Sequence, residues 1–271
     1  MGRVGILTCK GIQPMTRSHT KNVRAYVDGL DMSGYSRQIG ALSWMFAAEP
    51  DASFTDGSKN ILIGQPEINA GTLNTFMDNT ATVSPHVNLN TGTGTRNVMV
   101  AIGANAAPVA GNPVFAWKFE QSAYSVEQGS GFVTVSIPIG AASYASTLTY
   151  SKPWGVLLAP MAAYTAANTA VGIDDIGASS ALGGIFVYHA SSSNGTFTLT
   201  AQEADTNLNA SFANITGATS GSITAATTPQ SGMIALGATA AIKRYLRFQL
   251  ALGTASTVTF TSAFIRNNLA R

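Results

Sequence analysis

The sequence predicts an all-β fold, and three observations support that prediction. Apolar and polar residues alternate through Val23–Val27, Val133–Ile137 and Leu246–Leu252, which places one set of side chains on each face of a strand. Clusters of glycine, proline and asparagine separate these runs. The dipeptides Asp28-Gly29 and Asn194-Gly195 are those preferred in tight β-hairpins. Many short strands with such turns are typical of a β-sandwich or barrel.

The stretch Val23–Phe46 is expected to form strand, tight turns and strand. Its first apolar run is followed by Asp28-Gly29 and Ser33-Gly34, and a second apolar run extends from Ile39 to Phe46. Glycine supports such turns because it adopts positive φ without steric cost. Residues 1–22 have no sustained hydrophobic period, and we expect them to form an extended N-terminal arm.

Strands and loops are expected to alternate in the middle of the chain. The segment Ala47–Asn60 contains Pro50 and Asp56-Gly57 and is predicted to be a loop. Residues 83–95 are rich in Asn, Thr and Gly and are also predicted to be a loop, whereas Asn69–Asp78 is ambiguous between helix and strand. The runs predicted to be strands are Ile61–Ile63, Val98–Ile102, Val114–Phe119 and Phe132–Ile137.

The last hundred residues are predicted to form a separate β-sandwich. We place a domain boundary near residues 170–180, which gives an arm at 1–22, a first β domain at 23–172 and a C-terminal β-sandwich at 173–271. Residues 159–171 are read as a short helix or a linker. Two hairpins are expected beyond them. One joins Ile185–His189 to Thr196–Ala201 through Asn194-Gly195, and the other spans Tyr245–Ile265.

The composition favours a surface covered by other copies of the chain. Apolar residues make up 45% of the 271 positions and charged residues only 10%, whereas soluble domains typically have about 25% charged residues. A secreted β protein is the alternative reading of this composition. The one cysteine, Cys9, excludes an intrachain disulfide. The sequence lacks a long apolar run, so we expect no transmembrane helix and no membrane partner.

The charges divide the chain into three zones. Residues 1–24 carry five bases and no acid, residues 25–205 carry thirteen acids and five bases, and residues 206–271 carry five bases and no acid, which gives net charges of +5, −8 and +5. Basic ends and an acidic middle can fix the register of contacts between copies. Instead of contacting another copy, the basic N-terminus could bind nucleic acid. It has no aromatic residue on which bases could stack, which makes this alternative weaker.

No constellation of catalytic residues is apparent. The histidines His19, His86 and His189 are far apart, and no short His or Cys spacing indicates zinc. Asp28 and Asp31 flank a turn glycine, which is ordinary turn chemistry. Nucleophile-elbow and phosphate-loop motifs are absent from the sequence. We therefore expect neither catalytic activity nor a cofactor nor a metal, because an active site needs clustered titratable groups.

Two stretches carry a resemblance to a known family. Tyr26–Tyr35, YVDGLDMSGY, resembles a hairpin near the N-terminus of structural proteins of tailed bacteriophages, notably tail tube (major tail) proteins. Phe76-Met77-Asp78 stands near the position of a further family segment. Lys243–Arg247, KRYLR, together with Thr257–Arg266, looks like the ending that accompanies this hairpin in phage proteins. The two matches lie near opposite ends of the chain.

The resemblance implies a function as well as a fold. It implies a tail-tube-like β-sandwich or barrel that forms stacked, hexameric rings around a channel for viral DNA, with a second C-terminal β-sandwich outside. The partners would be other copies of the chain, other virion proteins and DNA passing without specific binding. The protein would be made in the bacterial host cytoplasm and reside in the virion tail. The residues expected at assembly interfaces are Arg3, Lys10, Arg17, Lys21, Tyr26, Asp28, Asp31 and Tyr35.

Two functions from other classes compete with the tail tube. One is a capsid decoration or head-fibre protein, which binds a capsid lattice from outside. The other is a glycan-binding adhesin module. The oligomeric state distinguishes them, since rings or tubes favour the tail tube, trimers the decoration protein, and a glycan-binding monomer the adhesin.

Overall fold

The computed structural model describes residues 20–51, 60–80, 84–129, 131–142, 152–167, 172–174, 179–225, 228–237 and 239–267. Strands dominate these ranges, and α1 (Pro85–Leu89) is a short helix that begins at the N-cap Ser84. The predicted all-β class is confirmed. The expected arm lies outside the described residues except for Thr20–Asn22, which form one 3₁₀ turn.

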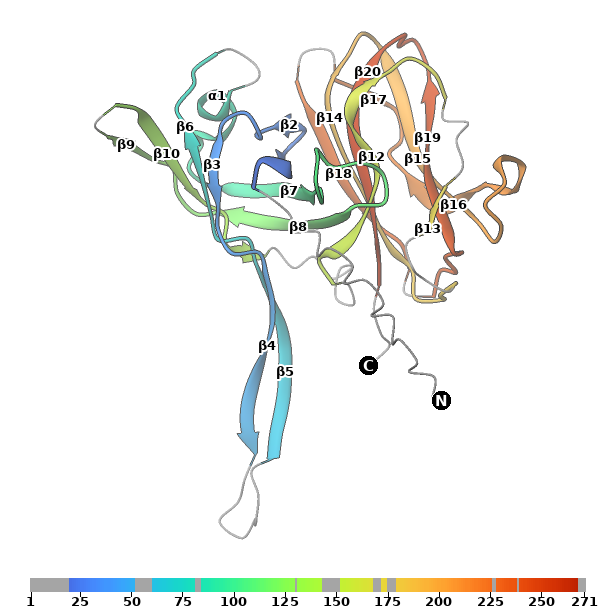
Figure 1. Ribbon diagram of the computed structural model, residues 1–271, viewed down its shortest axis with the longest axis horizontal. Helices are drawn as coiled ribbons and strands as arrows, with labels where there is room; N and C mark the ends of the chain where they lie inside the picture. Colours follow the sequence, from blue (N-terminus) through green and yellow to red (C-terminus); the bar gives the residue numbers. More distant parts are fainter. Residues whose placement is uncertain are drawn as a thin grey trace, which may run out of the picture.

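A nine-stranded antiparallel sheet forms the centre of the molecule (Figure 1). Its order is β18-β14-β20-β12-β8-β7-β1-β2, and β11 pairs with β8 beside this path. The strands are β1 (Val23–Val27), β2 (Leu30–Asp31), β7 (Gly94–Ile102), β8 (Pro113–Gln121), β11 (Ala141–Ala142), β12 (Trp154–Tyr164), β14 (Gly184–Ser193), β18 (Gln230–Ala235) and β20 (Val258–Arg266).

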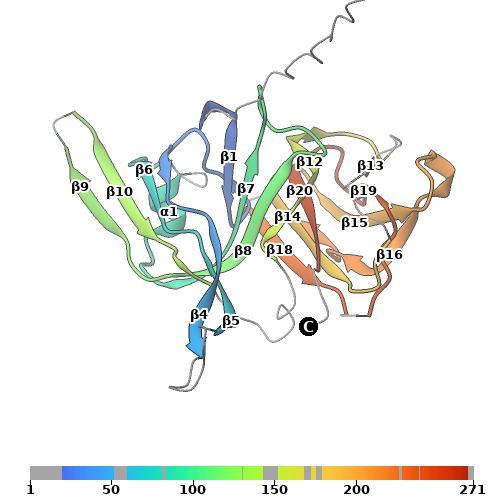
Figure 2. The same ribbon diagram turned by 60° about the horizontal axis from the view of Figure 1, so that its bottom comes forward.

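Two further sheets lie on either side of this centre (Figure 2). The first has the order β3-β6-β10-β9 and the second the order β13-β19-β15-β16, with β17 paired to β15. The strands of the first are β3 (Ser36–Ile39), β6 (Thr72–Phe76), β10 (Val133–Pro138) and β9 (Ser125–Gln128). Those of the second are β13 (Ile173–Asp174), β15 (Thr196–Ala204), β16 (Ala213–Thr219), β17 (Ile223–Thr224) and β19 (Tyr245–Leu252).

A long two-stranded ribbon stands apart from the three sheets. It consists of β4 (Ser43–Asp51) and β5 (Asn60–Asn69), which pair only with each other among the described strands. Figure 1 shows it projecting well beyond the body of the molecule. Residues 47–51 and Asn60 were predicted to belong to a loop; that prediction is wrong, because both strands continue past the expected boundaries.

Strands β12, β14 and β20 form a wall shared by two hydrophobic cores. Along β14, Ile185 and Val187 belong to the core on the side of β1, β7 and β8, whereas Phe186 and Tyr188 belong to the core under the C-terminal sheet. The same division holds along β20, where Ile265 faces the first core. A strand buried on both faces needs a continuous apolar run rather than alternation, as in the segment GIFVYHA.

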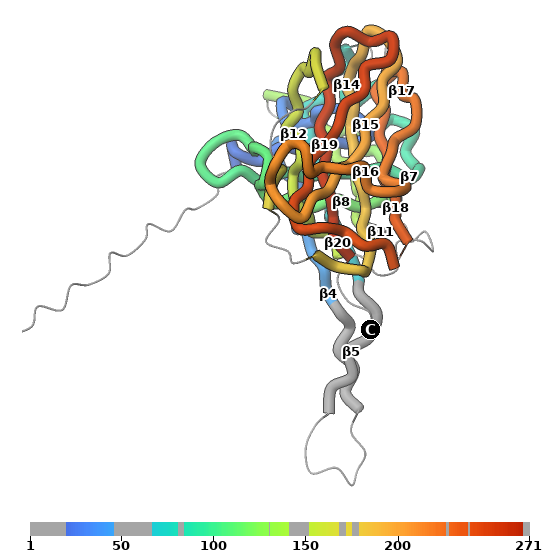
Figure 3. The backbone as a smooth tube through the Cα atoms, turned by 90° about the vertical axis from the view of Figure 1, so that its right-hand side faces the viewer, coloured from blue at the N-terminus to red at the C-terminus, as the bar shows by residue number. Residues whose placement is uncertain are grey.

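Both hairpins predicted in the C-terminal region are wrong. The strands exist, but β14 and β20 pair in the central sheet while β15 and β19 pair in the C-terminal sheet. The chain therefore turns a corner at Asn194 and again near residues 253–257, so that one long antiparallel ribbon folds over itself. Asn194 fixes this corner, because its Oδ1 accepts from the backbone N–H groups of Ser256 and Thr257 at 2.9 and 3.0 Å. Figure 3 looks onto these C-terminal strands.

Two other local predictions also need correction. Residues 159–164 lie in strand β12 rather than in a helix or linker. The predicted loop 83–95 contains the helix α1, whose N-cap Ser84 accepts from Val87 N, and its end is already strand β7. The ambiguous segment at 69–78 contains a strand, β6.

The central sheet includes strands from both sides of the predicted domain boundary. Strands β1, β7, β8 and β12 precede it, and β14, β18 and β20 follow it. The boundary near 170–180 stays a prediction, but the backbone hydrogen bonding between β12 and β20 connects the two sides.

Candidate assembly surfaces

The turn at Asp28-Gly29 closes the hairpin β1–β2. Asp28 has φ of 48° and Gly29 has φ of 92°, so both central residues lie in the left-handed region that a type I′ turn requires. Tyr26 pairs with Asp31 and Val27 with Leu30. A hairpin is thus present at this turn, but its second strand is Leu30–Asp31. The prediction that Ile39–Phe46 forms the second strand is wrong, because β1 pairs with β2 and β7 and not with that run. The second apolar run instead contributes to β3 and β4, which belong to other sheets.

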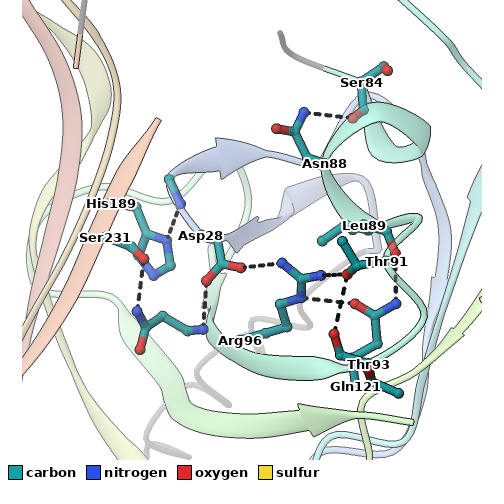
Figure 4. Close-up of polar contacts among 12 residues, drawn as sticks. Asp28, Ser84, Asn88, Leu89, Thr91, Thr93, Arg96, Gln121, His189 and Ser231 are labelled. Carbon is teal, nitrogen blue, oxygen red and sulfur yellow. Dashed lines mark hydrogen bonds and ion pairs between the residues drawn. The ribbon is translucent and has the colours of Figure 1, made fainter. Parts of the chain in front are cut away.

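The carboxylate of Asp28 connects this turn to strand β7 (Figure 4). Its Oδ1 accepts from the backbone N–H of Asn97 at 2.8 Å, and its Oδ2 accepts from Arg96 at 3.1 Å. Arg96 also donates to Gln121 Oε1 and Thr91 Oγ1. These bonds are internal and hold the turn in its left-handed conformation.

Gly29 and Asn97 bring the two ends of the central sheet together. The N–H of Gly29 donates to Nδ1 of His189 on β14, at 3.1 Å. Asn97 Nδ2 donates to Ser231 Oγ on β18 at 2.8 Å. Figure 4 shows His189 and Ser231 on the side of the turn that carries Asp28. A Cβ on Gly29 would lie 2.6 Å from the carbonyl oxygen of Gln230. The sheet therefore curls until its first and last strands meet through this glycine.

His189 is fully buried within β14 rather than at a strand end. Its Nδ1 accepts a hydrogen bond, so the proton is on Nε2, and burial lowers the pKa of the imidazole to about 3. The ring of Tyr26 lies beside it, with centroids 6.1 Å apart. Burial raises the pKa of the Tyr26 hydroxyl. His189 is a neutral structural acceptor here.

The structure divides the predicted interface residues into three groups. Arg3, Lys10 and Arg17 lie outside the described residues. Tyr26 is buried and Asp28 bonds internally, so the contacts observed for these two are intramolecular. Lys21 and Asp31 are exposed and Tyr35 is half-buried, and Asp31 Oδ1 accepts from Ser33 N in a local turn. A role for the set in contacts between copies stays a prediction.

Sequence reasoning missed the open edge at β9. All four of its residues are exposed, and on one side it pairs with β10. Phe132, which is 73% exposed, lies against Phe76 with ring centroids 5.5 Å apart in an edge-to-face arrangement. An exposed strand edge presents unpaired N–H and C=O groups that can pair with another chain. The preceding Gly131 could have indicated a turn here, but the exposure could not have been predicted from the sequence.

A basic cleft opens beside β1, β3 and β7. Its volume is about 530 Å³, and it is lined by Lys21, Arg24 and Arg37 with no acid among the described lining residues. Lys21 and Arg37 are exposed, whereas Arg24 donates to the backbone oxygens of Lys21 and Val23. The apolar lining residues are Val23, Ala25, Ile39, Leu42, Val100 and Ile102. Of the three bases, only Lys21 was among the predicted interface residues.

The C-terminal basic cluster is engaged within the chain. Lys243 Nζ lies 2.8 Å from Asp205, and Arg244 Nε donates to Asp174 at 2.9 Å. Arg247 donates to Gln202 and Asn209 and stacks over the ring of Phe212. Arg247 lies in strand β19, whereas Lys243 and Arg244 precede it.

The described residues show neither a metal centre nor a membrane span. Within them, no group of three or more His, Cys, Asp or Glu side chains is placed to hold a metal ion. No helix in the same part of the chain is long and apolar enough to cross a membrane.

Comparisons with solved structures yield a distant likeness. No protein-family model matches the chain, and no curated protein sequence matches it. Among solved structures, the Dit protein of SPP1, described as a paradigm of the hub adsorption apparatus in phages that infect Gram-positive bacteria, aligns with 91% of this chain and 99% of its own. The identity is 13% and the TM-score 0.30. A structural similarity this low supports no conclusion about the fold or function of this chain.

Proposed function

We propose that the chain is a structural protein of a tailed-phage virion that assembles with copies of itself into stacked rings, forming the tail tube that conducts DNA. Two observations on the described strands support this most: β4 and β5 pair only with each other, and β3 and β9 are edge strands of the sheet β3-β6-β10-β9. Isolated two-stranded ribbons are marginally stable in water. Contacts between copies would stabilise the ribbon and cover the edges, which are otherwise an aggregation hazard.

The sheet β3-β6-β10-β9 is the candidate lining of the channel. Val135 and Ile137 of β10 are buried against the core, so the intervening Thr134 and Ser136 lie on the opposite face. Glu127 of β9 pairs with Thr134 and therefore shares that face. The same face carries Phe76 and Asn74, which pair with Thr134 and Ser136. With one carboxylate and no base among these residues, the face would not hold DNA phosphates, whereas a basic face would bind them through counterion release.

Joining β3 of one copy to β9 of the next would continue this sheet around a ring. The two strands are the opposite edges of the same four-stranded sheet, so the contact is head-to-tail, and such contacts generate closed rings when the rotation closes. Six copies per ring is the number that the family resemblance implies. On this proposal the protein is not an enzyme and has no cofactor.

Negative-stain electron microscopy of the purified chain across a concentration series tests the proposal. Rings or tubes are expected. Trimers would instead favour a capsid decoration protein, and a monomer at every concentration that binds glycans would favour an adhesin. Deleting residues 1–20 provides a second test: if the arm docks on a neighbouring ring, the shortened chain should fold as a monomer and fail to polymerise.

A further inference from the structure

We propose that the basic cleft formed by β1, β3 and β7 receives the β4–β5 ribbon of a second copy of this chain. The inference rests on the proposed self-assembly and specifies two surfaces that would meet in it. The ribbon surface consists of the strands Ser43–Asp51 and Asn60–Asn69. The cleft surface consists of Lys21, Arg24 and Arg37 around an apolar floor.

The ribbon needs a partner surface because its own chain supplies little. Its strands pair with each other from Ser43↔Asn69 to Asp51↔Asn60 and with no other described strand. Its root is tied to the core through Ile68, which is 2% exposed. Nine- and ten-residue strands of this kind gain stability when a third surface packs on them.

The ribbon and the cleft carry opposite charges, and both also present apolar residues. The two strands of the ribbon contain the acids Glu49, Asp51 and Glu67 and no base, along with many apolar residues. The cleft contains three bases, and none of its described lining residues is acidic. Complementary potentials of this kind select the partner and fix the register of a contact.

The occupant of the cleft is a second copy rather than the ribbon of the same copy. Leu42 lines the cleft, and the ribbon begins at the next residue, Ser43. From this root the ribbon extends away from the body (Figure 1), so its acidic outer half cannot return to the adjacent cleft while its root stays paired. A contact between two different surfaces of identical copies is head-to-tail and can propagate.

The prolines of the ribbon favour docking of its side chains over addition of a further strand. Pro50 lies in β4 and Pro66 in β5, opposite Ile61 and Phe46 respectively. Proline has no backbone N–H, so it is a poor partner in a continuing ladder and is typical of protected edges.

Charge reversal on each surface tests the contact. The cleft variant is Lys21→Glu with Arg37→Glu, both exposed in the monomer, and the ribbon variant is Glu49→Lys with Asp51→Lys. Each variant alone should raise the concentration needed for half-assembly at least about tenfold, which corresponds to about 1.4 kcal/mol. An equimolar mixture should regain assembly, because each variant offers the surface that the other needs. The chain with all four substitutions should regain it as well.

The controls separate this contact from self-assembly in general. Asp205→Lys reverses an exposed acid that follows β15 of the C-terminal sheet and pairs with Lys243. It should leave assembly unchanged, and thermal denaturation should show that every variant folds. Wild-type assembly should weaken as salt rises, because exposed charges are screened. Assembly that is insensitive to salt, or variants that assemble like wild type, would overturn the contact and leave the proposed function standing. A wild-type chain that never assembles would overturn both.

Discussion

At the residue scale, the turn at Asp28-Gly29 could be predicted from the sequence but its partners could not. Asp-Gly specifies positive φ at two successive positions, and the structure has φ of 48° and 92° there. The acceptor for Gly29 is His189, 160 positions away. No local pattern indicates such a contact, because it depends on how the central sheet curls. The turn therefore has a second role, as the bridge between the two ends of that sheet.

Replacing Gly29 with alanine should destabilise the fold strongly. A non-glycine residue in this backbone region costs about 1–3 kcal/mol, and the added Cβ would clash with Gln230 O at 2.6 Å. Urea denaturation measures the free energy of unfolding. Gly34→Ala is the matched control, because a Cβ added to Gly34 would have no atom within 4 Å; it should change stability by less than about 1 kcal/mol. Equal effects at both glycines would contradict the bridging role.

Buried His189 predicts a specific loss of stability in mild acid. Its pKa is about 3 in the folded protein, against about 6.5 for an unfolded histidine. Between these values the unfolded chain binds a proton that the folded chain does not, so stability falls as pH decreases from about 6.5 to 3. The slope from this residue approaches about 1.4 kcal/mol per pH unit.

His189→Gln isolates that contribution, because glutamine can still accept from Gly29 but does not titrate. Unfolding free energies of both proteins should be measured from pH 7 to 4. The difference between the two unfolding free energies should change by up to about 1.4 kcal/mol per pH unit, which is the effect of one proton. Parallel curves would show that the histidine is not buried in its neutral form.

At the element scale, strand positions were predictable and strand pairing was not. The alternation in Tyr245–Leu252 correctly located β19, and Asn194-Gly195 correctly located a reversal of direction. The same turn dipeptide suits a hairpin and a sandwich corner, because both reverse the chain within a few residues. Only the burial of Phe248 against Phe260, with ring centroids 5.4 Å apart, shows that β19 and β20 face each other across a core.

Proline at Val126 should block the open edge of β9 without unfolding the monomer. Gly129 N donates to Phe132 O, and Val133 O accepts from Met77 on the other side, so hydrogen-bonded pairs alternate along the hairpin. By this alternation the N–H of Val126 points to the free edge and that of Glu127 points to β10. Val126→Pro should therefore impair assembly without destabilising the monomer.

Glu127→Pro is its control and should destabilise the monomer itself, by about 1 kcal/mol or more. Sedimentation velocity reports assembly, and thermal unfolding reports stability. If Val126→Pro assembled normally, β9 would not be an assembly edge.

Shortening the ribbon should separate folding from assembly. Replacing residues 47–65 with an Asn-Gly turn keeps the pair Phe46↔Pro66 and the root of the ribbon. Because the outer ribbon contributes no strand to the three sheets, the melting temperature of the monomer should stay close to that of wild type. Light scattering should show that polymerisation is lost. Intact polymers would exclude the ribbon from the contacts between copies.

At the scale of the whole molecule, the shared wall of β12, β14 and β20 joins the two cores. The sequence suggested two successive β domains, and its Gly- and Ala-rich middle could not reveal that strands from both sides enter one sheet. Low charge content and the three charge zones predict contacts between copies, but they do not predict which surfaces would meet, because that depends on the fold. The ribbon, the sheet edges at β3 and β9, and the basic cleft are the surfaces proposed to meet between copies.

Hydrogen exchange measured on the assembled protein and on dilute monomer tests self-assembly through these features most directly. In monomer, the amides of Ser125–Gln128 that face the free edge and those of the outer ribbon should exchange quickly, since little covers them. In the assembled protein, both segments should gain protection, while β14 and β20 are slow in both states. Assembly that leaves β9 and the ribbon exchanging as fast as in monomer would contradict self-assembly through these surfaces.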